Sequence, residues 1–120
     1  MNLNHLNLTV TKPSETAAFL MKYFGMRNMV PGEVAENASM AFLTDDNGMV
    51  LSMIRGKRGV DINYPASFHI GFIQPSHEAV NEMSRRLKED GYDVPDPSEQ
   101  HGSWTFYFEA PGGFVIEVLG

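Results

Sequence analysis

The stretch "SFHIGFI", residues 67–73, decides the fold, because it begins a second copy of a pattern that starts at "HLNLTV", residues 5–10. Both stretches alternate with the period of two that is typical of strands, and both carry a histidine near their start. A helical pattern that ends at a glycine follows each of them, and further strand patterns come next. The chain is therefore predicted to contain an internal repeat.

The first copy reads as strand, helix, strand, strand, strand. After the strand at 5–10, we expect a helix behind "TKPS", with Ser14 as its N-cap and Gly25 at its end. Strands are predicted at 26–31, 39–44 and 49–54, and the turn sequence "DDNG" joins the last two.

The second copy has the same order. A helix capped by Ser76 and ended by Gly91 follows the strand at 67–73, a short proline-limited strand is expected at 92–97, and residues 103–120 form a hairpin. The predicted fold class is α+β, with two βαβββ modules at about 1–60 and 65–120. At this length, we expect one domain over residues 1–120.

Laying one copy over the other pairs His5 with His69 and Ser52 with Glu117. The separations agree, because His5 and Ser52 are 47 residues apart and His69 and Glu117 are 48 apart. Strand parity places both histidines and Glu117 opposite the bulky apolar side chains that face the helices. We therefore expect these three side chains to converge inside a curved mixed sheet that surrounds a cavity.

Two imidazoles and one carboxylate on one face suit a divalent first-row ion such as Fe(II), Mn(II), Ni(II) or Zn(II). Three protein ligands leave coordination positions open for water or substrate. A single histidine on a half-buried strand is more often structural, so the repeated position is what favours a metal site.

Composition excludes several other classes of protein. The net charge of −6 and a pI near 5.0 argue against nucleic acid or an anionic membrane as a partner. The absence of cysteine excludes disulfides, zinc-thiolate sites and a cysteine nucleophile. The alternating start "MNLNHLNLTV" is unlike a signal peptide, and no apolar run is long enough for a membrane span. We expect a soluble, cytoplasmic protein.

The paired modules, "FHIGF" at the start of the second and "APGGFVIEV" at 110–118, resemble the vicinal oxygen chelate superfamily. That superfamily includes glyoxalase I, extradiol dioxygenases, fosfomycin-resistance thiol transferases, methylmalonyl-CoA epimerase and bleomycin-binding resistance proteins. The resemblance covers essentially the whole chain and implies that His5, His69 and Glu117 bind one divalent metal per site. It also implies a homodimer, in which modules exchanged between subunits complete each sheet.

Ser52 departs from the pattern of the glyoxalase-like and epimerase-like members, which have a fourth ligand, Glu or Gln, at that place. A neutral serine is a poor ligand for these metals, so we expect a three-ligand site with water or substrate near Ser52. This set resembles the dioxygenases and the fosfomycin enzymes, which chelate a substrate through two oxygens.

Other residues are candidates for contacts with a substrate. Tyr107 can donate a hydrogen bond to a substrate oxygen, although it also suits a solvent-facing position. Thr105 shares its strand face and is a further candidate for a substrate contact. His101, in "SEQHGS", is a candidate acid or base or a mobile loop residue. In "RGKRG", residues 55–59, Arg55 or Arg58 can meet an anionic substrate or simply be solvated.

Two functions therefore stand at this point. One is a metal-dependent enzyme that acts on a small, oxygen-rich substrate as a lyase, dioxygenase or thiol transferase. The other is a metal-free protein, similar to the bleomycin-binding members, that binds a cationic or aromatic drug in an acidic groove. The intact His/His/Glu set favours the enzyme, and the net charge suits the binding protein.

Overall fold

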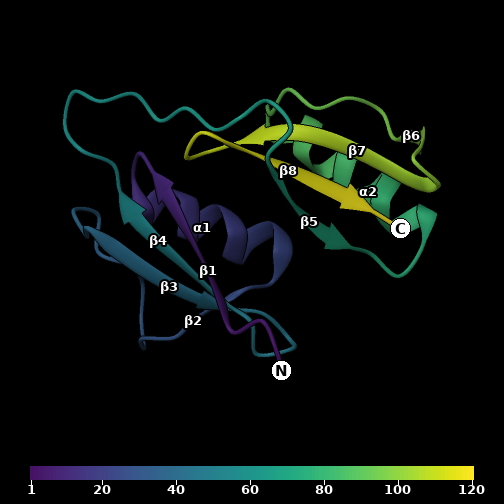
Figure 1. The fold of residues 1–120 in the computed structure, drawn as a ribbon. Helices are drawn as coiled ribbons and strands as arrows, with labels where there is room; N and C mark the ends of the chain where they lie inside the picture. The colour runs from purple at the N-terminus through teal and green to yellow at the C-terminus, as the bar shows by residue number, and fades with distance from the viewer. The chain divides into compact units, whose positions relative to one another are not determined.

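The computed structural model describes all 120 residues, as two helices and eight strands (Figure 1). The chain divides into two compact units, Met1–Tyr64 with Pro111–Gly113, and Pro65–Ala110 with Phe114–Gly120. Each unit carries its own four-stranded mixed sheet and one helix, in the order βαβββ. The predicted α+β class and the internal repeat are confirmed.

The first sheet has the strand order β1-β4-β3-β2. Its elements are β1 (His5–Val10), α1 (Pro13–Phe24), β2 (Arg27–Asn28), β3 (Met40–Thr44) and β4 (Val50–Arg55). The pairing of β1 with β4 is parallel, and the other pairings are antiparallel. Helix α1 covers one face of the sheet, where Leu8, Leu20 and Met53 are fully buried. The opposite face carries His5 and Ser52.

The second sheet has the equivalent order β5-β8-β7-β6. Its elements are β5 (His69–Ile73), α2 (His77–Glu89), β6 (Ser98–Gln100), β7 (Ser103–Ala110) and β8 (Phe114–Leu119). Helix α2 packs on β7 and β8, and Leu87, Phe106 and Ile116 are fully buried between helix and sheet. The pairing of β5 with β8 is parallel, as β1 with β4 is in the first unit.

The two helices begin differently. Ser76 caps α2 as predicted, since its Oγ accepts a hydrogen bond of 3.1 Å from the Ala79 N–H. The prediction of Ser14 as the cap of α1 is wrong, because the helix begins at Pro13 and Lys12 is its N-cap. Proline suits the first helical position, where its missing N–H costs nothing. The Ser14 hydroxyl instead donates to the Glu36 carbonyl oxygen at 3.2 Å.

Two predicted strands need correction. Residues 92–97 form no strand, because Pro95 and Pro97 have no N–H to donate, and β6 lies at Ser98–Gln100 instead. The strand expected at 26–31 is limited to Arg27–Asn28. The Asn28 side chain ends it, since it accepts from the Val30 N–H and donates to the Gly32 carbonyl oxygen.

Neither helix has the length and the apolar run that crossing a membrane requires.

Candidate metal centre

Strands β5 and β8 set His69 and Glu117 on the same face of the second sheet. In their parallel register, Gly71 lies opposite Glu117 and His69 lies opposite Val115. His69 and Gly71 are two residues apart, so their side-chain positions share one face. Phe114, Ile116 and Val118 point to the other face and are buried under α2. Glu117 and His69 are therefore free to meet on the face that no helix covers.

The two side chains do meet, with 3.3 Å between His69 Nε2 and Glu117 Oε1. The other ring nitrogen, Nδ1, lies 2.9 Å from the Ser67 carbonyl oxygen, to which its N–H can donate. This contact favours the tautomer in which Nε2 carries a lone pair. A lone pair that faces a carboxylate oxygen across this distance is repelled unless a proton or a cation lies between them.

Thr105 fixes the second oxygen of the carboxylate. Its Oγ1 lies 2.8 Å from Glu117 Oε2 and 2.9 Å from the Val118 carbonyl oxygen, and its single hydroxyl proton can bond to either acceptor. Thr105 is fully buried, and the Glu117 side chain is only 13% exposed. With Oε2 held in this way, Oε1 is the oxygen that is turned toward His69.

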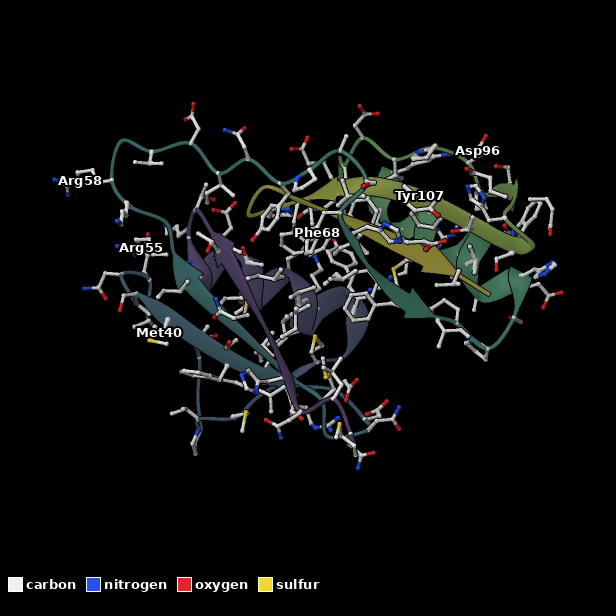
Figure 2. All side chains as sticks on the ribbon, in the orientation of Figure 1. Met40, Arg55, Arg58, Phe68, Asp96 and Tyr107 are labelled. Atoms are coloured by element: carbon white, nitrogen blue, oxygen red, sulfur yellow. The ribbon has the colours of Figure 1, made fainter.

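Tyr107 completes the cluster from β7. It lies directly opposite Glu117 in the antiparallel register of β7 and β8. Its ring meets the His69 ring edge-on, with 5.3 Å between the centroids. Burial raises the pKa of the Tyr107 phenol, and the hydrogen bond and negative charge of Glu117 raise it further. The phenol is thus held in its neutral form, which can donate a hydrogen bond. Figure 2 labels Tyr107 on β7 of the second unit.

The His69 and Glu117 donors fit a divalent transition metal. Two ligand atoms that each lie about 2.1 Å from one ion, at an angle between about 90° and 110°, are about 3.0–3.4 Å apart. The observed 3.3 Å lies in this range. Gly71, opposite the carboxylate, has no side chain, and a Cβ there would lie 3.9 Å from Glu117 Oε1 and 3.5 Å from Leu119 Cδ2. The pair is incomplete as a site, because no third His, Asp or Glu joins it within its unit.

The equivalent place in the first unit is occupied differently. Asn7 takes the position of Gly71, opposite Ser52. The Ser52 hydroxyl lies 2.8 Å from Asn7 Oδ1 and is nearly buried at 7% exposure. His5 is exposed, with its Nδ1 2.9 Å from Asn4 Oδ1 and no hydrogen bond at Nε2. Ser52 is thus engaged within its own sheet, while His5 has a nitrogen available for a ligand.

The remaining candidates belong to other segments of the chain. His101 is an exposed turn residue with a φ of 51°, between β6 and β7. Arg55 ends β4 in the first unit and donates to the Ala38 carbonyl oxygen at 3.2 Å. Their suggested roles as an acid or base and as a substrate contact stay predictions.

Sequence reasoning did not anticipate two of the contacts at these positions. Thr105 was expected to touch substrate, whereas its hydroxyl lies against the Glu117 carboxylate and the Val118 carbonyl oxygen. The sequence contained a signal for the Thr105 contact, because Thr105 lies two residues before Tyr107 and so shares its strand face. The Asn7 contact with Ser52 had no local signal, since it depends on the register of two strands that are far apart in sequence.

Comparison with known proteins gives one family and many similar structures. The family described as Glyoxalase/Bleomycin resistance protein/Dioxygenase superfamily matches residues 2–118. No match is found among curated proteins. A solved structure of a possible glyoxalase from Bacillus cereus is 42% identical, with a TM-score of 0.86, and the match covers 100% of this chain and 99% of that one.

Two more distant structures share the fold. A lactoylglutathione lyase from Agrobacterium tumefaciens is 18% identical, with a TM-score of 0.73 and coverage of 98% of this chain and 92% of that one. A mutant of the fosfomycin resistance protein FosX from Listeria monocytogenes is 20% identical, with a TM-score of 0.77 and coverage of 99% and 91%. That structure is a complex with Mn(II) and 1S,2S-dihydroxypropylphosphonic acid.

The Glu117→Gln variant should lower the pKa of Tyr107 in protein kept metal-free with EDTA, because the carboxylate charge disfavours the phenolate. Burial remains, so the pKa should stay above the ordinary value for tyrosine. A pH titration of ζ-¹³C-labelled tyrosine by NMR measures it. The control is Glu109→Gln, which removes an exposed charge from the same face of β7. An equal effect of both variants would contradict the assignment of the shift to Glu117.

Proposed function

Because the chain belongs to the Glyoxalase/Bleomycin resistance protein/Dioxygenase superfamily and pairs His69 with Glu117, we propose that it is a metal-dependent enzyme acting on small molecules. The observation that most directly supports this proposal is the distance of 3.3 Å between His69 Nε2 and Glu117 Oε1, on the sheet face that no helix covers. His69, Glu117 and His5 would hold one divalent ion, either Fe, Mn, Ni or Zn. The ion supplies a Lewis acid and a template for a substrate that binds it through two oxygens.

The neighbouring residues have separate roles in this proposal. Thr105 positions the Glu117 carboxylate so that one oxygen stays directed at His69. The Ser67 carbonyl oxygen does the same for the imidazole, by holding the proton on Nδ1. Tyr107, kept neutral, would turn its single hydroxyl hydrogen from Glu117 to a substrate oxygen and stabilise negative charge that develops there.

The chemistry of the first unit favours a three-ligand centre. The Ser52 hydroxyl is a neutral group engaged with Asn7, so it offers neither a fourth ligand nor a carboxylate base for moving a proton between carbons. This supports thiol-transfer or dioxygenase chemistry over glyoxalase chemistry. The Mn(II) complex of the similarly folded fosfomycin resistance protein is compatible with this choice.

One observation favours the second candidate, a metal-free drug-binding protein. Met40, Phe42 and Ile54 are 44%, 36% and 39% exposed on the face of the first sheet that α1 leaves uncovered. An apolar face of this kind can hold an aromatic ligand without any metal. Metal binding therefore separates the two functions.

The protein should bind one Mn(II) per chain, and His69→Ala and Glu117→Ala should each weaken binding by at least about a hundredfold, since each removes a ligand. Isothermal titration calorimetry on chelator-treated protein measures this. The matched control is His77→Ala, which removes an exposed imidazole that is not a proposed metal ligand. His77 lies on α2 and stacks on Trp104. Wild-type protein that takes up no divalent transition metal would favour the drug-binding function.

The third proposed ligand, His5, belongs to the other unit, so it can come from the same chain or from a second one. We extend the proposal to a homodimer in which His5 of one subunit joins His69 and Glu117 of a second subunit. The uncovered apolar face of the first sheet supports it, since such a face is commonly buried in an interface.

Mixing the His5→Ala and His69→Ala variants tests the shared site. If each centre takes ligands from two chains, a mixed dimer has one intact centre and one without either histidine. After the two variants are unfolded and refolded together, each mixed dimer should therefore contain one tight Mn(II) site, which is half of its two centres. If all three ligands come from one chain, no tight site returns, and the shared arrangement is wrong.

A further inference from the structure

A second candidate site lies on the first unit, where a loop rich in positive charge follows β4. A hollow of about 370 Å³ is lined there by eight residues, which are Thr11, Lys12, Arg55, Gly56, Lys57, Arg58, Val60 and Ile62. Four of them are cationic and none is acidic. None of the residues proposed to bind the metal lines this hollow.

Three of these cations have no acidic partner, although the chain has 15 acidic and nine basic residues. Elsewhere Arg27 pairs with Asp46, and Lys88 pairs with Asp96. Arg55, Lys57 and Arg58 form no ion pair, although all three are exposed. Their mutual repulsion would be relieved by a bound anion.

Nearby acidic groups do not neutralise the hollow. Lys12 pairs with Glu36 at 3.1 Å, but Glu36 is not one of the lining residues. Asp61 is the single acid of the loop, and it lines an adjoining hollow of about 510 Å³ that shares Arg55 and Lys57 with the first. The lining of the first hollow itself therefore holds four cations and no acid.

Backbone and side-chain contacts tether the loop that carries the cations. The Gly56 N–H donates to the Val10 carbonyl oxygen at 2.9 Å, and the Val60 N–H donates to the Lys57 carbonyl oxygen at 3.2 Å. At the far end, the Tyr64 hydroxyl donates to the Thr9 carbonyl oxygen and accepts from the Thr9 N–H, both at 2.8 Å. Tethering both ends reduces the entropy that a ligand would have to overcome.

We infer that Lys12, Arg55, Lys57 and Arg58 form a binding site for a small organic phosphate. Figure 2 shows Arg55 at the end of β4 and Arg58 on the loop beyond it. Guanidinium groups bind phosphate oxygens through two parallel hydrogen bonds, and lysine adds point charges. Val60 and Ile62 offer apolar contacts for the organic part. The volume is within the range of small-molecule pockets. This inference goes beyond the proposed function, because it needs no metal.

Phenyl phosphate is the probe, titrated at constant ionic strength into ¹⁵N-labelled protein that has been stripped of metal and dialysed into chelator-free buffer. Saturable shifts are expected at the backbone amides of residues 11–12 and 56–60. The double variant Lys57→Gln/Arg58→Gln should weaken binding at least about tenfold, since it removes charge-assisted hydrogen bonds. Arg58→Gln alone should weaken it at least about threefold.

The matched control is Arg85→Gln/Lys88→Gln, which removes the same charge from exposed cations of α2. It should leave the affinity within about twofold of wild type. Equal losses in the two double variants, or shifts in wild type that never saturate, would overturn the site. Succinate serves as the carboxylate arm, and binding of succinate as tight as that of phenyl phosphate would overturn the choice of phosphate. Because the protein is metal-free throughout, neither result depends on the proposed metal.

Discussion

The parallel register of β5 against β8 is the constraint on which the candidate site depends. It places Gly71 opposite Glu117, and so brings His69, two residues earlier, onto the same face as the carboxylate. A slip of one residue would turn Glu117 toward α2 and bury its charge among Phe114, Ile116 and their neighbours. The fully buried residues of β8 oppose this slip, because they would have to leave the core. Packing under the helix thus determines the chemistry on the other face.

The two units show how one backbone plan supports different side-chain chemistry. In the first, Asn7 and Ser52 face each other and their polar groups satisfy one another at 2.8 Å. In the second, glycine replaces asparagine and glutamate replaces serine, so a charged oxygen remains available beside an imidazole. The contrast explains why only one of the two sheets holds a paired histidine and carboxylate. In the first unit, the residue with a ring nitrogen free for a ligand is His5.

Sequence alone predicted what depends on strand parity and missed what depends on pairing between distant segments. The shared face of His69 and Glu117 followed from a period of two and from the repeat, because both are local properties. The prediction of Ser14 as the N-cap of α1 was wrong, since its hydroxyl donates to the Glu36 carbonyl oxygen. No helix pattern in the sequence reveals that contact. Residues 92–97 form no strand, since Pro95 and Pro97 have no N–H to donate to a neighbouring strand. That His5 binds the same metal ion as His69 and Glu117 is still a prediction.

The most direct test of the central claim is anomalous X-ray diffraction from crystals grown with Mn(II). We predict one strong peak per chain, within about 2.3 Å of His69 Nε2, Glu117 Oε1 and a ring nitrogen of His5. The same map would show whether that His5 belongs to the same chain or to another. A saturated crystal with no peak between His69 and Glu117, or with Mn(II) held only by other side chains, would contradict the account.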